Sequence, residues 1–122
     1  AILCSTARRA LETLDQVRPR LAGKPALTID KAIYRADSAA LLEMVRGLPE
    51  TASSALLIGH NPALEEFCQS LAGGGPKELR AAMAEKYPTG ALAVLVLPQE
   101  PWSETGWKSA ELRSFTAPKD LV

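Results

Sequence analysis

Short apolar runs alternate with segments of helical periodicity along the chain. Residues 1–4 and 55–58 are continuous apolar runs, which are typical of strands that are covered on both faces. Apolar residues recur every three or four positions in 7–21, 41–48 and 64–71, and this spacing predicts helices with one buried stripe. The alternation predicts an α/β fold with a largely parallel sheet.

The remaining segments complete the predicted architecture. A short strand is expected at 27–29, and a loop at 73–76 leads into a fourth helix. Residues 91–97 form the longest apolar run, which predicts a central strand. Residues 112–116 alternate between apolar and polar, which predicts a half-exposed edge strand that pairs back in the antiparallel sense. We therefore expect a three-layer sandwich with a mostly parallel sheet and an antiparallel edge strand.

Polar residues at the starts of the predicted helices are candidate caps. Ser5 offers a side-chain oxygen at the N-cap of the first helix, and Asp37 or Ser38 can cap the second. Asn61 is a strong N-cap residue, and Pro62 suits the first helical position after it. We expect Asn61 to shape the turn and to cap the third helix.

Composition narrows the classes of function. Fourteen basic and fourteen acidic residues cancel, so no global field attracts nucleic acid or an anionic membrane. No apolar run reaches membrane-spanning length, and Cys4 and Cys68 lack the spacing of a redox or metal pair. We expect a cytoplasmic protein with buried free thiols. We expect no metal, no organic cofactor, and no nucleic-acid or membrane partner.

Two strand-to-helix junctions carry the polar residues that matter for chemistry. Ligands collect beyond the carboxyl ends of parallel strands, and a helix N-terminus offers free N–H groups to an anion. The junction at 4–9 adds Ser5 and an arginine, and the junction at 58–62 adds His60, the only histidine in the chain. If the two strands are neighbours, arginine and histidine converge on one anion, as phosphoryl transfer requires.

Spacing separates the two arginines of the first junction. Adjacent helical residues point about 100° apart, whereas residues four positions apart share a face. Ser5, Arg9 and Thr13 therefore line one side of the helix. Arg8 points to solvent, and Arg9 is the candidate ligand of the anion.

Four segments form a pattern that is more specific than either junction alone. Residues 5–13 have the form S-x-x-x-R-A-x-x-T, and residues 58–65 read I-G-H-N-P-A-L-E. Residues 86–93 read K-Y-P-T-G-A-L-A, and residues 118–121 read P-K-D-L. Together they resemble the histidine phosphatase superfamily, especially its small phosphohistidine-phosphatase (SixA-like) branch, and the match covers nearly the whole chain. The resemblance implies a phosphoglycerate mutase-like fold.

The resemblance also implies a role for each junction residue. In this family the histidine of an Arg-His motif attacks phosphorus, and the phosphohistidine is then hydrolysed. Arg9 would hold the phosphoryl oxygens, His60 would donate hydrogen bonds to them, and Ser5 would lie at the pocket edge. Asn61 would complete the phosphate-binding turn.

The nucleophile of that mechanism is absent from the sequence, because no Arg-His pair occurs in it. We therefore expect residues 1–122 to form a single domain that is N-terminally incomplete. The strand with the nucleophile is expected roughly a few tens of residues upstream, because a crossover between parallel strands needs a dozen or more. Residues 1–122 on their own are expected to bind phosphate without turnover.

The acid that protonates the leaving group stays open between three carboxylates. Glu65 lies near His60 in sequence, and Asp30 and Asp37 lie between the two junctions. We expect a phosphatase that acts through a phosphohistidine intermediate on protein phosphohistidine or a small phosphate ester. The alternatives are a phospho-ligand-binding or regulatory module that lacks the nucleophile, and a flavodoxin-like domain whose motifs are a coincidence.

Overall fold

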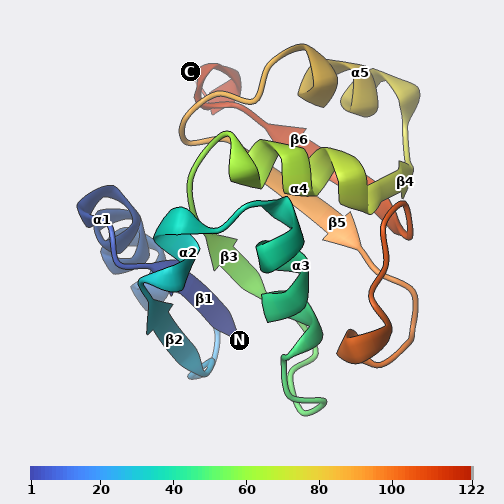
Figure 1. Cartoon of the computed structure of the whole chain (residues 1–122). Coiled ribbons are helices and arrows are strands. Elements are labelled where there is room, and N and C mark those ends of the chain that lie inside the picture. Colours follow the sequence, from blue (N-terminus) through green and yellow to red (C-terminus); the bar gives the residue numbers. More distant parts are fainter. Residues whose placement is uncertain (122) are drawn as a thin grey trace.

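Two three-stranded sheets form the middle layer of the molecule, with helices on both sides (Figure 1). The structure is a computed structural model that describes residues 1–121. The strands are β1 (Ile2–Ser5), β2 (Leu27–Asp30), β3 (Leu56–Ile58), β4 (Ala72–Gly74), β5 (Leu92–Val96) and β6 (Ala110–Thr116). The α-helices are α1 (Arg8–Val17), α2 (Ala32–Arg35), α3 (Ser38–Arg46), α4 (Ala63–Leu71) and α5 (Lys77–Glu85). The 3-10 helices are η1 (Arg18–Arg20), η2 (Trp102–Glu104) and η3 (Pro118–Leu121), and no helix within residues 1–121 is long and apolar enough to cross a membrane.

Strand β1 is the centre of the first sheet and pairs in parallel with β2 and β3. All four of its residues are buried, as predicted for a strand covered on both faces. Cys4 is in register with Ile58, so β1 and β3 end at the same edge of the sheet. The two predicted junctions therefore lie at that edge.

The two faces of the first sheet are covered by different helices. Helix α1 packs Ala10 and Leu14 against one face of β1 and β3. Leu3, on the other face, belongs to a larger cluster with buried residues of α3, α4 and α5. That cluster also contains Leu112 of β6. One hydrophobic core thus joins both sheets, and the predicted three-layer sandwich is confirmed.

The second sheet differs from the prediction in its strand order. Strand β6 lies in the centre, parallel to β4 and antiparallel to β5. The predicted antiparallel pairing of 91–97 with 112–116 is confirmed, but the predicted places of the two strands are wrong. In the part of the chain that the structure describes, β5 has one neighbour and β6 has two. An apolar run indicates a demand for burial, and it does not determine how many strands pair with it.

Strand β4 occupies part of the segment at 73–76 that was predicted to be a loop. A Cβ on Gly73 would overlap the backbone carbonyl of Lys108, and Gly75 has a φ of +117°. Glycine is required at both positions, because the first lies too close to another backbone and the second has a conformation that other residues rarely adopt. The glycine run therefore marks a close approach between two chain segments.

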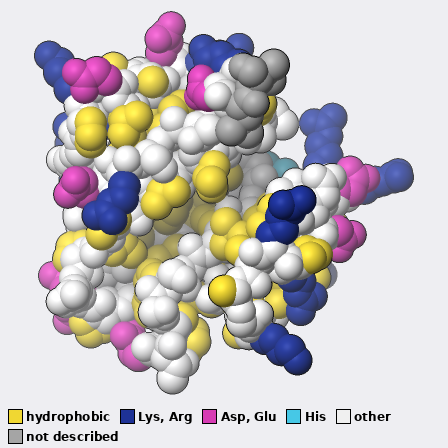
Figure 2. Space-filling model, turned by 180° about the vertical axis from the view of Figure 1, so that it is seen from behind, with side chains coloured by type: hydrophobic (Ala, Val, Ile, Leu, Met, Phe, Trp, Pro, Cys, Tyr) yellow, Lys and Arg dark blue, Asp and Glu magenta, His cyan; other side chains and the backbone are white. Residues whose placement is uncertain are grey.

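One face of β5 is open. Leu92, Val94 and Val96 are 53%, 39% and 38% exposed, whereas Ala93 and Leu95 between them pack against the shared core. Figure 2 shows hydrophobic side chains around a hollow on the face opposite to the view of Figure 1. Strand β5 thus has one covered face and one uncovered apolar face.

The starts of α1 and α3 test two of the predicted caps. Asp37 caps α3, because its Oδ1 accepts a hydrogen bond from the N–H of Ala40 at 2.8 Å. Ser5 does not cap α1, because it is the last residue of β1 and Ala7 occupies the N-cap position. The Oγ of Ser5 instead accepts from the N–H of Ala7 at 3.2 Å, which holds the turn between strand and helix.

The predicted cap of α4 is also wrong. Helix α4 begins at Ala63, and Pro62 rather than Asn61 is its N-cap, without a side-chain cap bond. The Nδ2 of Asn61 instead donates to the carbonyl oxygen of Tyr87 at 2.9 Å. This bond uses the amide to tie the junction to the segment before β5.

Candidate functional site

The carboxyl ends of β1 and β3 bring Ser5 and His60 into contact. The Oγ of Ser5 lies 2.7 Å from the Nε2 of His60. Ser5 is fully buried and also accepts the N–H of Ala7, so its position is fixed from two sides. The two junctions that the sequence identified therefore meet at one point, and His60 is held there by a buried hydroxyl.

Arg9 lies in the first turn of α1, a few residues after this contact. Its side chain is exposed and forms no ion pair within residues 1–121. Arg8 instead bonds Glu12 at 3.1 Å with 93% of its side chain exposed, as predicted for the arginine that points to solvent. The Oγ1 of Thr13 donates to the backbone oxygen of Arg9 at 3.0 Å, so this hydroxyl is engaged within the helix. Arg9 is thus the cation of this junction that is available to an anion.

Helix α2 brings to the site a residue that the sequence did not reveal. The Oδ1 of Asp30 accepts from the N–H of Ala32 at 2.8 Å, and Ile33 is buried. The ring centroid of Tyr34 then lies 5.2 Å from that of His60, at an interplanar angle of 65°. A four-residue helix is shorter than the window in which helical periodicity is detected. The available signal was Asp30 itself, since aspartate often bonds the backbone two residues ahead and starts a turn.

A cavity of about 250 Å³ opens beside His60, between α2 and the start of α4. Glu66 lines this cavity, whereas Glu65, the acid considered from sequence, lies in the first turn of α4 but not in the lining. The other two carboxylates have structural bonds, because Asp30 and Asp37 each accept a backbone N–H. Glu66 is therefore a carboxylate near His60 that sequence reasoning overlooked.

Both cysteines are buried free thiols, as predicted. Burial raises the pKa of Cys4 and of Cys68, which disfavours the reactive thiolate. The Sγ of Cys68 lies 3.8 Å from the Oη of Tyr87, and burial also raises the pKa of that phenol. Neither thiol is prepared as a nucleophile. Within residues 1–121, no group of three or more His, Cys, Asp or Glu side chains is placed to hold a metal ion.

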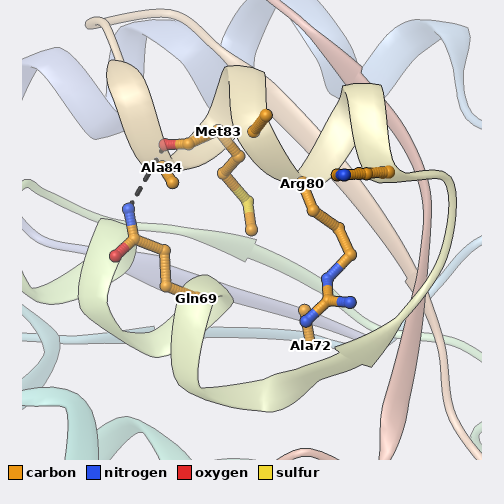
Figure 3. Close-up of a pocket in the computed structure, with 7 residues that line it drawn as sticks. Gln69, Ala72, Arg80, Met83 and Ala84 are labelled. Carbon is orange, nitrogen blue, oxygen red and sulfur yellow. Dashed lines mark hydrogen bonds between the residues drawn. The ribbon is translucent and has the colours of Figure 1, made fainter.

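A larger pocket of about 340 Å³ lies between α4 and α5, away from these residues (Figure 3). The Nε2 of Gln69 donates to the carbonyl oxygen of Met83 at 3.2 Å across it. Lys77 and Arg80 add positive charge, and the remaining lining residues are alanines. The lining contains no hydroxyl, histidine or carboxylate. This pocket therefore offers fewer kinds of reactive or acid–base group than the smaller cavity beside His60.

Comparison with known sequences finds relatives that match nearly the whole chain. An uncharacterized protein of Mycobacterium leprae is 30% identical over 120 residues, which cover 97% of this chain and 71% of that protein. An uncharacterized protein of Mycobacterium tuberculosis is 28% identical over 121 residues, which cover 98% of this chain and 73% of that protein. No protein-family model matches the chain.

Solved structures similar to this one are phosphohistidine phosphatases by name. The putative phosphohistidine phosphatase SixA from Nakamurella multipartitia has a TM-score of 0.77 at 23% identity, over 96% of this chain and 69% of that chain. The putative SixA from Agrobacterium tumefaciens has a TM-score of 0.72 at 28% identity, over 96% of this chain and 66% of that chain. A protein histidine phosphatase SixA complexed with tungstate has a TM-score of 0.71 at 20% identity, over 99% of this chain and 70% of that chain.

These likenesses agree with the two junction motifs and with the contact between Ser5 and His60. They exclude the flavodoxin-like alternative, in which the motifs were a coincidence. The chain belongs to the same family as the Mycobacterium leprae protein, and it is a SixA-like member of the histidine phosphatase superfamily.

Proposed function

We propose that this protein is a phosphatase that binds a phosphoryl group beyond the carboxyl ends of β1 and β3. The observation that carries the proposal is the 2.7 Å contact between Ser5 and His60 at the start of α1. Arg9 stands nearby in sequence without an ion-pair partner in residues 1–121. The names of the similar SixA structures and the tungstate anion bound to one of them support the same conclusion.

Each residue of the site has a physical reason for its proposed role. Negative charge spreads over the equatorial oxygens in the transition state of phosphoryl transfer, and donors already in place stabilise it. The guanidinium of Arg9 can bind two of those oxygens, and the free N–H groups that start α1 add to its field. A phosphoryl oxygen then competes with the Oγ of Ser5 for a proton on the Nε2 of His60.

Asn61 takes an indirect part in the proposed site. Its amide is engaged with the carbonyl oxygen of Tyr87, so it fixes the chain directly after His60. We assign it the positioning of His60, and we assign phosphate binding to Arg9, His60 and Ser5. The substrate proposed on these grounds is protein phosphohistidine or a small phosphate monoester, because the core pocket suits both.

The proposed mechanism needs a second histidine, since His60 is the only one in the sequence. We infer that the functional protein carries an Arg-His strand, and two unpaired edges support a place for it. In residues 1–121, β3 pairs only with β1 and β5 pairs only with β6. Leu57 of β3 and Leu95 of β5 nevertheless pack against the same core. A strand paired with β3 in parallel would end at the same edge of the sheet as His60.

The single histidine also favours a second candidate function. A protein with Arg9, Ser5 and His60 but without a nucleophile would bind a phosphorylated ligand and not hydrolyse it. Such a module would regulate or report on phosphorylation. Turnover separates the two functions, because both predict phosphate binding at the same residues.

Phosphatase assays of the full-length protein, with a phosphohistidine protein and with p-nitrophenyl phosphate, test the proposal. Arg9→Ala and His60→Ala are each expected to lower kcat/KM by about 100-fold or more, as loss of a transition-state donor does. Arg8→Ala is the matched control and should stay within about twofold, because Arg8 is exposed and bonded to Glu12. Full activity in either variant would contradict the role of that residue. Phosphate binding by the wild type without turnover would support the binding module.

A further inference from the structure

The cavity beside His60 is lined by neither Ser5 nor Arg9, the other residues of the proposed phosphoryl site. Ser5 contacts the Nε2 of His60, and the phosphoryl group is proposed to bind there. Tyr34 contacts the ring of His60 and lines the cavity between α2 and α4. The apolar part of the lining includes Ile33, Leu41 and Ala63. The cavity therefore offers apolar space next to a site built for an anion.

Tyr34 lines this cavity from helix α2, which is held in place by its own contacts. Its side chain is 59% exposed, although Ile33 beside it is only 3% exposed. The short helix that carries both is started by the bond from Ala32 to Asp30, so α2 is held at its beginning and on its inner face. One side of the Tyr34 ring contacts His60, and more than half of the residue is free. An aromatic ring in this position can pack against a second planar group.

The size and charge of the cavity select the kind of group that fits. A cavity of about 150 Å³ can hold a benzene ring, so about 250 Å³ accommodates one ring and the atoms that link it. Arg35, Asp37 and Glu66 line the cavity and are exposed, and none of them forms an ion pair in the described chain. One positive and two negative side chains disfavour an anion at this place. The cavity suits a planar group that carries no negative charge.

We propose that this cavity binds the planar group that carries the phosphoryl, an imidazole or phenyl ring, and that Tyr34 is a specificity-determining residue. The inference rests on the proposed function, because that function places the phosphoryl group at Ser5 and His60. It adds a preference among phosphoryl donors that the anion site alone does not provide. A donor with a ring gains contact with Tyr34, and a donor with a small aliphatic group does not.

Two phosphonates that differ only in the attached group test this preference. Phenylphosphonate and methylphosphonate present the same anion and are not hydrolysed, so binding to the full-length protein can be measured by titration calorimetry or NMR. The wild type is expected to bind phenylphosphonate more tightly. Tyr34→Ala should lower the affinity for phenylphosphonate by about threefold to tenfold, the range of an aromatic contact. It should leave the affinity for methylphosphonate within about twofold. Tyr34→Phe keeps the ring and should behave as the wild type does.

The outcomes separate this inference from the proposed function. Equal affinity for the two phosphonates, unchanged in Tyr34→Ala, would overturn the proposed ring subsite. The proposed anion site would not be affected by that result. Equal weakening of both ligands in Tyr34→Ala would also overturn it, because Tyr34 would then act only through His60. Absence of binding by either phosphonate, with an intact circular dichroism spectrum, would overturn the anion site and the subsite together.

Discussion

The two sheets of this protein are built from similar apolar segments and have different surroundings. In the first sheet, β1 has a neighbour on each edge and all four of its residues are buried. In the second sheet, β5 has one neighbour in the described chain, and alternate side chains are exposed. The proposed chemistry lies at the end of the enclosed strand β1. A contact proposed for phosphoryl transfer, such as that of Ser5 with His60, needs rigid support, and β1, which is buried on both faces, provides it.

The comparison shows what hydrophobicity does and does not specify. The seven-residue apolar run that contains β5 exceeds the run at β1, and yet β1 is the central strand and β5 lies at an edge. An edge strand with an apolar face is a liability, because its free N–H and C=O groups can pair with another chain. The free edge of β5 in the described chain is thus a place where the Arg-His strand proposed above could pair.

The largest effect is expected at the most deeply buried positions of the two sheets. Leu112 is fully buried in β6, and Ile2 is 1% exposed in β1. Leu112→Ala and Ile2→Ala should each lower the free energy of unfolding by about 2–5 kcal/mol, because each leaves a cavity. Urea unfolding monitored by circular dichroism measures both losses. Similar losses in a single transition would show that the sheets unfold together, and a loss below about 1 kcal/mol in Leu112→Ala alone would show that the second sheet is less tightly packed.

The next effect is specific to the first sheet. Ser5→Ala removes the Oγ that bonds both Ala7 and His60, and a buried group left without its partner costs about 1–3 kcal/mol. Ser53→Ala, at an exposed position, is the control and should change stability by less than about 0.5 kcal/mol. Thermal or urea unfolding compares the two variants. Equal stability of Ser5→Ala and Ser53→Ala would mean that the Ser5–His60 contact is not maintained in solution.

The same contrast explains how far the sequence could predict the structure. The strand at 1–4, the helix after it and the segment around His60 combine local signals with burial, so both junctions were identified. Their meeting at one edge of a sheet followed from parallel pairing. The exchange of β5 and β6 could not be foreseen, because the number of strand neighbours depends on residues far apart in sequence.

The sequence did not predict Tyr34 and Glu66 as parts of the candidate site, because the patterns that would reveal them are too short or too fine. Tyr34 lies on a helix of four residues, which is too short for a periodic pattern. Glu66 rather than Glu65 lines the cavity, and one position along a helix changes direction by about 100°. The start of α4 decides that direction, and directly before it Asn61 bonds the carbonyl oxygen of Tyr87, a contact between distant segments.

A smaller effect concerns the buried thiol of Cys68. Burial raises its pKa in the folded protein above the ordinary value of 9.0, and burial raises the pKa of the neighbouring Tyr87 above 10.0. The unfolded chain therefore loses these protons first, so stability is full below about pH 9 and declines as pH rises toward the folded values. Cys68→Ala should show a shallower decline than the wild type in urea unfolding at about pH 8 and pH 10.5. Identical declines would contradict burial of the thiol. Cys4→Ala offers the matching test in the first sheet, because burial raises that pKa too.

The smallest effect is expected on the exposed face of β5, and it distinguishes that face from the buried one. Val94 is 39% exposed, whereas Leu95 packs against the shared core. In a protein of residues 1–122, Val94→Thr keeps the branched shape that suits a strand and should change the free energy of unfolding by less than about 0.5 kcal/mol. Leu95→Thr should lower the free energy of unfolding clearly more than Val94→Thr does. If the functional protein carries the proposed strand beside β5, that strand and its crossover would cover the open face. Val94→Thr should then lower the free energy of unfolding by about 1–3 kcal/mol, as other buried polar substitutions do. An equally small cost in both proteins would mean that the face stays open and that the proposed strand lies elsewhere.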